Sequence, residues 1–337
     1  MGERAPSIAI AGAGYWGKNL LRTFSRLAGA RVTSLCDLDP ERLEAARADH
    51  PDLDCGSDFA ALIRRPDVDA VVVATPPSHP PAMALAALRA GKHVWVEKPL
   101  ALSVAHGREL VDAARDASRV LFVDETFRYD PLVREMKRLV DAGALGPVLH
   151  LTFERLGMGR IRRDSNVWWN SAPHDLSILF YLVPRPLSAI RLYRHAHLQP
   201  GIADVALCDV ELEGGVSAHI HLSWLHPEKT AKVVVVGRER MLAYEGRFEK
   251  RGLTLYDFTL DLSPPAERGA APIVPISGFA GRALEVPAAT EPLALAAEHF
   301  VECVRTGTEP LTSGARSLRV VEALETADRT AIGSGSA

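Results

Sequence analysis

The sequence predicts an α/β protein with two domains: a doubly wound parallel sheet, followed by a domain with a large, open and mostly antiparallel sheet. Up to residue 127, short apolar runs alternate with segments of helical periodicity, an order that is typical of a doubly wound parallel sheet. Between residues 148 and 236, longer runs, several of them alternating between polar and apolar residues, follow one another without predicted helices, which indicates antiparallel strands with one covered face. The length of 337 residues fits two domains.

Short apolar runs in the first domain are predicted strands, and most of the segments between them are predicted helices. The strands are 7–11, 32–36, 70–74, 93–96 and 120–124, and the helices are 17–27, 40–49, 81–90 and 103–117. Pro40 suits the first turn of its helix, and Ser103 suits the N-cap of the last one. Because such strands are parallel, their carboxyl ends meet at one edge of the sheet, where open α/β sheets bind ligands.

The second domain is predicted to contain one helix, a run of strands and two closing helices. The first helix is 131–142, the strands are 148–155, 189–195, 206–212, 216–224 and 232–236, and the closing helices are 293–305 and 315–330. Residues 260–292 are rich in Pro, Gly and Ala and are predicted to form loops. We therefore divide the chain into a first domain, 1–127, a second domain, 128–332, and a flexible tail, 333–337.

The overall composition gives no sign of attraction to nucleic acids or membranes. The formal net charge is −3, and no apolar run approaches the ~20 residues that a membrane-spanning helix needs. The short polar segment before the first predicted strand leaves no room for a signal peptide. The four cysteines are scattered without a C-x-x-C pair, so neither a disulfide framework nor a cysteine zinc site is indicated, and a reducing cytoplasm is the expected location.

A glycine-rich motif, G-x-G-x-x-G, follows directly on the first predicted strand and opens the first helix. We assign five of its residues as cofactor contacts: Gly12, Gly14, Tyr15, Trp16 and Gly17. In this context Gly12 permits a tight turn, Gly14 lets the backbone approach a pyrophosphate, and Gly17 lets helix and strand pack closely. The N–H groups and the positive dipole at the start of the helix would bind the phosphate groups. The motif therefore predicts a dinucleotide site.

Two further strand ends belong to this predicted site. Asp37 follows the second strand about 20 residues after the glycine motif, where an acid hydrogen-bonds the adenosine ribose. Because Asp37 would repel a 2′-phosphate, the cofactor is predicted to be NAD rather than NADP. Thr75 and Pro76 follow the strand 70–74 and are assigned to a rigid wall of the site. His79, in the same segment, is either a cofactor contact or a solvent-facing loop histidine.

Glu97-Lys98-Pro99 follows the predicted buried strand 93–96, at the sheet edge where ligands bind. Pro99 restricts the backbone of Lys98 and so fixes the direction of the lysine. Taken alone, the tripeptide is either a charged surface turn or an acid–base group beside a cofactor. The glycine motif favours the second interpretation, because it predicts a dinucleotide at the same edge.

Together these residues make the chain resemble the glucose-fructose oxidoreductase, inositol dehydrogenase and rhizopine-catabolism (Gfo/Idh/MocA) family over nearly its whole length. The segments that carry the resemblance are GAGYWGKN, CDLDPER, VVVATPPSHP, GKHVWVEKPLAL, NVWWNSAPHDLSILFYL and HIHLSWLHPEK. The last two, with RLGMGRIRRDSN before them, are similar to the branch that contains nucleotide-sugar 3-dehydrogenases. The resemblance implies an NAD-binding Rossmann domain, a second domain whose open sheet serves in the contacts of a homodimer or homotetramer, and an active site between the domains.

The resemblance also implies roles for particular residues. Glu97 and Lys98 match the family's E-K-P motif, whose lysine lies near the nicotinamide and the reacting hydroxyl. A later D-x-x-x-H motif supplies an acid and a histidine beside the substrate; the histidine maps to His174, but the acid maps to Asn170. Asparagine carries no charge, so it can orient a hydroxyl but cannot take its proton. Asp175 follows His174, but adjacent helical side chains point about 100° apart, and we expect a supporting contact for it instead.

Arginines in a predicted loop before this motif suit a phosphate-bearing substrate. They are Arg155, Arg160, Arg162 and Arg163. Guanidinium groups bind phosphate through paired hydrogen bonds, and we assign Arg160 and Arg163 to the diphosphate of a nucleotide sugar. The alternative is a solvated basic loop with scattered acids such as Asp164.

Arg128 and Tyr129 follow the last strand of the first domain, where family members often place substrate contacts, and we assign both to substrate binding. Two H-x-H pairs also occur in the second domain, at residues 195 and 197 and at residues 219 and 221. Such pairs can bind zinc, but no third ligand is evident, so we expect exposed histidines on a strand face and no metal.

The sequence thus predicts an NAD-dependent oxidoreductase that acts on a CH–OH group of a sugar, with C3 of a nucleotide sugar as the expected site. Lys98 would take or give the hydroxyl proton, and His174 would bind the same oxygen or relay that proton. A free lysine has a pKa of about 10.4, which burial and a nicotinamide cation should lower toward the ~7–8 that suits a base. The alternatives are a cyclitol or amino-cyclitol dehydrogenase, an enzyme that cleaves glycosides through transient oxidation, and a non-catalytic NAD-binding protein, which only Asn170 supports.

Overall fold

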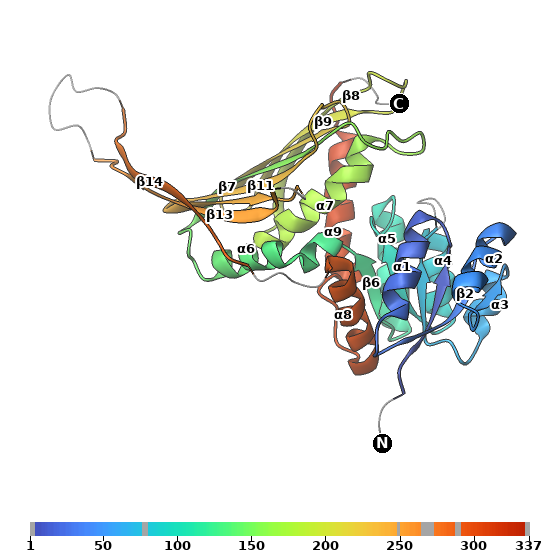
Figure 1. Ribbon diagram of the computed structural model, residues 1–337. Helices are drawn as coiled ribbons and strands as arrows, with labels where there is room; N and C mark the ends of the chain where they lie inside the picture. Colours follow the sequence, from blue (N-terminus) through green and yellow to red (C-terminus); the bar gives the residue numbers. More distant parts are fainter. Residues whose placement is uncertain (1–3, 76–79, 248–249, 264–272, 287–290, 334–337) are drawn as a thin grey trace. The chain divides into compact units, whose positions relative to one another are not determined.

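The computed structural model describes residues 4–75, 80–247, 250–263, 273–286 and 291–333, and the chain divides into two compact units (Figure 1). Unit 1 comprises Met1–Asp130 and Thr290–Glu325, and unit 2 comprises Pro131–Ala289 and Thr326–Ala337. The predicted second domain, 128–332, is corrected by this division, because the chain returns to unit 1 after residue 289. All but the first residue of the predicted tail, 333–337, lies outside the described residues.

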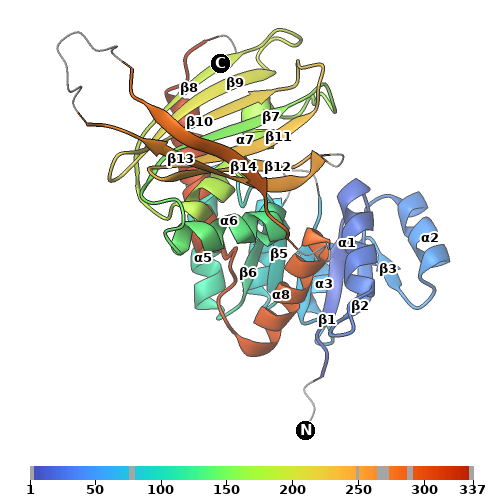
Figure 2. The same cartoon turned by 60° about the vertical axis from the view of Figure 1, so that its left-hand side comes forward.

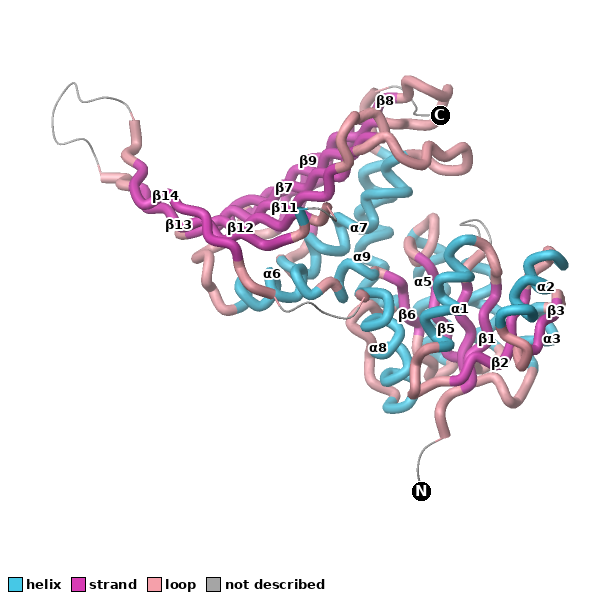
Figure 3. The backbone as a smooth tube through the Cα atoms, viewed as in Figure 1, coloured by secondary structure: helices cyan, strands magenta, loops and turns pink. Residues whose placement is uncertain are grey.

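Unit 1 is built on a six-stranded parallel sheet with the strand order β3-β2-β1-β4-β5-β6 (Figure 3). Its strands are β1 (Ser7–Ala11), β2 (Arg31–Cys36), β3 (Asp54–Gly56), β4 (Ala70–Val73), β5 (His93–Glu97) and β6 (Leu121–Asp124). The predicted doubly wound sheet is confirmed. Strand β3 was not predicted, because three residues are too short to show a periodic pattern.

Helices cover both faces of this sheet. They are α1 (Tyr15–Ser25), α2 (Pro40–Asp49), α3 (Phe59–Arg64), α4 (Pro80–Arg89), α5 (Val104–Asp116), the 3₁₀ helix η1 (Thr126–Tyr129), α8 (Pro292–Thr306) and the part of α9 (Gly314–Arg329) up to Glu325. The side chains of Asp39, Asp58 and Ser103 accept backbone N–H bonds at the starts of α2, α3 and α5. Such caps fix where a helix begins and so set the length of each turn that leaves a strand.

An aromatic cluster explains why α8 belongs to unit 1. The ring of Phe300 lies 6.1 Å from Phe24, 5.6 Å from Trp95 and 5.5 Å from Phe122. Trp95 and Phe122, on neighbouring strands, are stacked at 4.3 Å. All four side chains are fully buried. These contacts pack α8 against one face of the sheet, although the residues are up to about 280 positions apart in the sequence.

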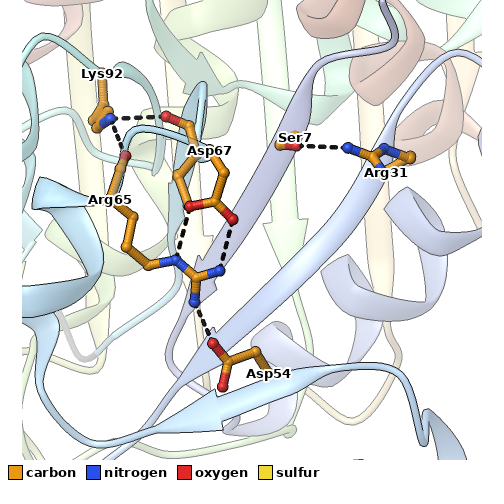
Figure 4. A network of polar contacts seen from close by, with 7 residues as sticks. Ser7, Arg31, Asp54, Arg65, Asp67 and Lys92 are labelled. Atoms are coloured by element: carbon orange, nitrogen blue, oxygen red, sulfur yellow. Dashed lines mark hydrogen bonds and ion pairs between the residues drawn. The ribbon is translucent and has the colours of Figure 1, made fainter.

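Buried Lys92 fixes the loops at the opposite edge of the sheet, where strands begin. Its ammonium group donates to the backbone oxygens of Arg65 at 2.6 Å and Val68 at 2.8 Å. The guanidinium group of Arg65 in turn bridges the carboxylates of Asp67 and Asp54 (Figure 4). Burial lowers the pKa of Lys92. Because its donors are used within this network, Lys92 is a structural lysine and not a candidate for chemistry.

Unit 2 contains an eight-stranded sheet with the order β14-β13-β12-β11-β7-β10-β9-β8 (Figure 2). Its strands are β7 (Val148–Leu156), β8 (Leu187–His195), β9 (Val205–Leu212), β10 (Val216–Ser223), β11 (Thr230–Gly237), β12 (Arg240–Glu245), β13 (Gly252–Leu260) and β14 (Ile276–Ala283). Strands β7 and β10 are parallel, and each other neighbouring pair in this order is antiparallel. The predicted large, mostly antiparallel sheet is therefore confirmed.

Helices α6 (Pro131–Asp141) and α7 (Val167–Leu182) complete unit 2, and α7 packs against strands β7, β9 and β10. The period of two in β10 is visible in burial: Ala218, Ile220 and Leu222 are buried, whereas the side chains between them are not. A sheet with one face under helices explains why the sequence showed this alternation.

Part of the segment 260–292, which was predicted to form loops, is a strand. β14 pairs with β13, and all eight of its residues are exposed. The ring of Phe279 on β14 stacks on Tyr256 of β13 at 5.8 Å. An exposed edge strand buries neither face, so it lacks the apolar alternation that marks other strands, and its glycines add to the appearance of a loop.

Candidate active site

The glycine motif forms the turn between β1 and α1, and two of its glycines have no space for a side chain. Gly12 has a φ of +105°, and a Cβ atom there would lie 2.6 Å from the backbone oxygen of Ala74. A Cβ atom on Gly17 would lie only 1.9 Å from the backbone oxygen of Gly12. A Cβ atom on Gly14, by contrast, would meet no described atom within 4 Å. The turn is therefore tightly packed on its inner side and open at Gly14.

The start of α1 is suited to an anion. Gly14 is the N-cap residue and has no side chain to occupy the first N–H groups, and the first turn contains no acidic residue. Unpaired N–H groups and the helix dipole attract phosphate at such a position. Tyr15 and Trp16, 61% and 49% exposed, flank the turn. The geometry of the three glycines fits a pyrophosphate, and contacts from Tyr15 and Trp16 remain a prediction.

The carboxylate of Asp37 is held beside this turn. Its Oδ2 accepts the N–H of Ala13 at 2.6 Å, and its Oδ1 accepts the N–H of Asp39 at 2.8 Å. Nη1 of Arg42 lies 3.7 Å from Oδ2, and the Asp37 side chain is 9% exposed. The acid thus has a fixed position next to the phosphate turn, which is what recognition of an adenosine ribose requires.

Strand order brings other predicted residues to the same edge. Because β1, β4 and β5 are parallel neighbours, the turn after β1, Thr75 after β4 and Lys98 after β5 all leave the sheet at one edge. The hydroxyl of Thr75 donates to Sδ of Met83 at 3.5 Å. Pro76 and His79 lie outside the described residues, so their assignment to the cofactor site remains a prediction.

Glu97 ends β5 and is paired in register with Asp124, which ends β6. Asp124 is 2% exposed, and Oε1 of Glu97 is shielded from solvent. Because residues paired in register on neighbouring strands lie side by side, the two carboxyl groups are neighbours, and the hydroxyl of Thr126 donates to Oδ1 of Asp124 at 2.6 Å. Sequence reasoning missed Asp124, although this residue ends a predicted strand. Asp37 and Glu97, which were selected, each directly follow a predicted strand.

The environment of this carboxyl pair favours the protonated form. Burial raises the pKa of Glu97 well above its usual value, and the charge of Asp124 raises it further. Burial also raises the pKa of Asp124 to about 6, although hydrogen bonds from Thr126 and Glu97 oppose this. The positive charge of Lys98 lowers the pKa of both groups. Lys98 therefore lies next to a titratable pair of which Asp124 is buried and Glu97 is half-buried.

Tyr129, predicted to be a substrate contact, is packed in the core of unit 1, which argues against that assignment. The side chain is fully buried, and its hydroxyl is hydrogen-bonded to Nδ1 of His299 at 3.0 Å and to Oγ1 of Thr312 at 3.2 Å. Packing beneath α8 uses this residue for the core of unit 1. Arg128 is also buried, with an ion pair to Glu125 at 3.1 Å. A substrate contact from Arg128 remains a prediction.

In unit 2, Asn170 and His174 lie four residues apart on α7 and therefore on one face of that helix. Asn166 caps α7 by accepting a backbone N–H of its first turn. Asp175 is 2% exposed and forms a paired contact with Arg155 of β7, at 2.7 and 3.2 Å. Asp175 thus holds α7 on the sheet, as expected of a supporting residue, and does not replace the acid that is absent at position 170.

Two of the four arginines that were predicted to lie in a loop form ion pairs with acids. Arg155 is bound to Asp175, and Arg162 is bound to Asp164 at 2.6 Å. Arg160 and Arg163, the two predicted phosphate contacts, are exposed.

The prediction of exposed strand-face histidines holds in part: His195 and His219 lie on β8 and β10, whereas His197 follows β8 and His221 of β10 is half-buried. His195, His197 and His219 are exposed, and His219 is bound to Asp209. Within the described ranges, no cluster of three His, Cys, Asp or Glu side chains has the geometry of a metal site. None of the described helices has the length and apolar character of a membrane span.

Two family models match the chain. One, described as an oxidoreductase family with an NAD-binding Rossmann fold, matches residues 7–125, and the Gfo/Idh/MocA C-terminal domain matches residues 133–243. The chain belongs to the Gfo/Idh/MocA oxidoreductase family. The resemblance inferred from the motifs is thereby confirmed, together with the NAD-binding Rossmann domain and the assignment as an NAD-dependent oxidoreductase.

Individual relatives of this Gfo/Idh/MocA protein carry several names. Inositol 2-dehydrogenase 2 of Saccharopolyspora erythraea is 31% identical over 223 residues, which are 64% of this chain and 66% of that protein. A solved structure from Magnetospirillum magnetotacticum is 29% identical, with a TM-score of 0.80 over 96% of this chain and 99% of that one. A UDP-N-acetylglucosamine 3-dehydrogenase from Acidithiobacillus ferrooxidans shares the fold, with a TM-score of 0.82 over 96% and 97% of the two chains at 22% identity.

Proposed function

We propose that the protein transfers a hydride between NAD and a secondary alcohol or ketone on a sugar or cyclitol ring, and that Lys98 handles the hydroxyl proton. The observation that carries this proposal is the position of Lys98 at the edge of the sheet where the parallel strands end. Lys98 follows β5, the glycine turn follows β1, and only β4 lies between these two strands. Lysine at such an edge is within the part of an open α/β sheet where ligands bind. Family membership supplies the oxidoreductase class.

Each residue of the predicted site would have a distinct role in this reaction. The backbone at Gly14 and the carboxylate of Asp37 would hold the pyrophosphate and ribose of NAD, which supplies the hydride chemistry when bound. Lys98 would take the hydroxyl proton during oxidation and return it during reduction. His174 would hydrogen-bond the same oxygen, and Asn170 would orient a substrate hydroxyl without accepting a proton.

Two substitutions test the role of Lys98. Lys98→Ala should lower kcat by at least about 100-fold while NAD binding, measured by calorimetry, stays within about threefold. Lys98→Arg is the matched control, because arginine keeps the positive charge but does not deprotonate in the working pH range. We expect both variants to be equally inactive. Near-normal turnover of Lys98→Ala would remove Lys98 from the mechanism, and an active Lys98→Arg would reduce its role to charge.

For the substrate, we propose a nucleotide sugar whose diphosphate is bound by Arg160 and Arg163. Both side chains are exposed on the segment before α7, where guanidinium groups can meet a diphosphate, and Arg162 on the same segment forms an ion pair with Asp164. The double variant Arg160→Ala and Arg163→Ala should raise KM for a nucleotide sugar by about tenfold or more and leave kcat nearly unchanged. Arg162→Ala is the matched control and should change neither constant.

A free cyclitol is the second candidate substrate, favoured by the inositol 2-dehydrogenase among the relatives. It has no diphosphate, so the arginine double variant would leave its KM unchanged. A screen of nucleotide sugars and cyclitols with NAD, followed through NADH absorbance, separates the two. Turnover of inositols at higher kcat/KM than any nucleotide sugar would overturn the diphosphate assignment and keep the role of Lys98.

A further inference from the structure

Two carboxyl groups lie side by side above the aromatic cluster of unit 1. The register of β5 and β6 pairs Trp95 with Phe122 and, two residues further on, Glu97 with Asp124. Because side chains alternate between the two faces of a strand, both pairs are on the same face of the sheet. Trp95 and Phe122 are stacked and fully buried. The carboxyl pair therefore borders an apolar surface on one side, which disfavours charge on it.

A hydrogen bond between the two carboxyl groups requires a proton. Glu97 and Asp124 are neighbours in the register of β5 and β6, and Thr126 donates to Oδ1 of Asp124. An ionised carboxyl group has only acceptors, so two carboxylates cannot form a hydrogen bond without a proton between them. Oε1 of Glu97 is shielded from solvent and has no hydrogen-bond partner among the described residues. A neutral carbonyl oxygen tolerates such a position better than a charged one.

The charged groups near the pair can balance one negative charge on its two carboxyl groups, but not two. Lys98 is the cation beside both groups. Glu125 adds negative charge near Asp124 and is itself paired with Arg128. A single anion on the pair is balanced by Lys98, whereas a second anion would be buried beside a like charge. Burial raises the pKa of both carboxyl groups, which agrees with this count.

We propose that Glu97 and Asp124 share one proton at neutral pH and form a positioning group that presents a single negative charge to Lys98. Glu97 is the neutral donor in this pair, and Asp124 is the anion. When Lys98 takes a proton from the substrate hydroxyl, the anion stabilises the ammonium group that forms, and no proton leaves the pair. The role toward Lys98 rests on the proposed function, but the shared proton does not.

The shared proton is tested without turnover, by infrared spectroscopy of the full chain at neutral pH. A neutral carboxyl group has a carbonyl stretching band that ionised groups lack. We expect this band in the wild type and expect Glu97→Gln to lose it. Labelling the wild type with isotope-labelled glutamate should shift the same band, which assigns it without any variant. A spectrum with no neutral glutamate band would overturn the proposal.

The effect of the pair's negative charge on Lys98 is tested by the pH dependence of alcohol oxidation. Glu97→Gln replaces a neutral donor by a neutral donor of the same shape, so the acidic limb of kcat/KM should stay in place. The double variant Glu97→Gln and Asp124→Asn removes the anion, so this limb should move to lower pH by about one unit or more. Equal shifts in the single and double variants would mean that Glu97 is ionised, and no shift in the double variant would remove the pair from the chemistry.

These outcomes are distinguishable from failure of the proposed function. If Lys98→Ala kept normal turnover, the pH experiment would lose its meaning, but the infrared band would still report the shared proton. If the band were absent while Lys98→Ala was inactive, the lysine mechanism would stand and the carboxyl pair would not.

Discussion

The inner side of the glycine turn offers the sharpest test of the cofactor site, because Gly17 and Gly14 occupy one motif but differ in their surroundings. In Gly17→Ala, the new Cβ atom would lie 1.9 Å from the backbone oxygen and 2.7 Å from the carbonyl carbon of Gly12. Both neighbours are backbone atoms, so α1 has to move by about 1.5 Å before the contact reaches an ordinary 3.4 Å. Overpacking of this kind costs about 3 kcal/mol, and the better helix propensity of alanine returns about 1 kcal/mol.

The net loss of about 2 kcal/mol corresponds to a Tm lower by about 4–8 °C for a unit of this size. Differential scanning calorimetry of the NAD-free protein measures this change. Gly14→Ala is the matched control: its Cβ atom meets no described atom within 4 Å, so Tm should stay within about 2 °C. The same methyl group would face the pyrophosphate, and the Kd for NAD should rise by about tenfold or more. A Gly17→Ala protein with unchanged Tm, or a Gly14→Ala protein with unchanged NAD affinity, would refute this account of the turn.

Three further substitutions test other contacts. Asp175→Ala leaves the guanidinium group of Arg155 without its carboxylate and should lower the free energy of unfolding by about 2–4 kcal/mol in urea, whereas Asp164→Ala, which breaks an exposed pair, should cost less than about 1 kcal/mol. Tyr129→Phe removes two buried hydrogen bonds and should cost about 1–2 kcal/mol without changing the substrate KM; a raised KM would restore Tyr129 as a substrate contact. Burial holds the pKa of His93 at about 4, below the usual 6.5, so the unfolded chain binds the proton first and stability is lost as pH falls from about 6.5 to 4. His93→Gln should remove up to about 2 kcal/mol of this pH dependence in urea titrations, and an unchanged pH profile would contradict it.

The parallel sheet of unit 1 was predictable because each of its longer strands is a short apolar run that stands alone in the sequence. β1, β2, β4, β5 and β6 lie within one residue of their predicted bounds. The assignment of α8 was not predictable in this way. Its place depends on Phe300 reaching Phe24, Trp95 and Phe122, and no local pattern shows which sheet an amphipathic helix will cover.

The candidate site shows the same division between local and distant information. The need for glycine at positions 12 and 17 was predictable because it follows from a turn directly after a strand, and the position of Lys98 at the sheet edge was predictable because Lys98 follows a recognisable strand. The burial of Tyr129 was not predicted because its partners, among them Thr312, come from a distant segment that returns to unit 1. Asp124 was missed because its partner is set by which strand lies beside β6, and a single sequence does not display that neighbour.

Asn170 is a weaker argument against turnover when the charged groups of each unit are taken into account. In unit 2, Asp175 is buried against Arg155 and does not supply the absent acid on the face of α7 that carries His174. In unit 1, however, Lys98 has its own anionic neighbour in the pair of Glu97 and Asp124. The electrostatic support of the lysine is thus part of the unit that folds around it and does not depend on residue 170. An asparagine there changes how a substrate hydroxyl is held, but it leaves the balance of charge at the proposed proton acceptor intact. For this reason, Asn170 is a weak argument for a protein that binds NAD without turnover.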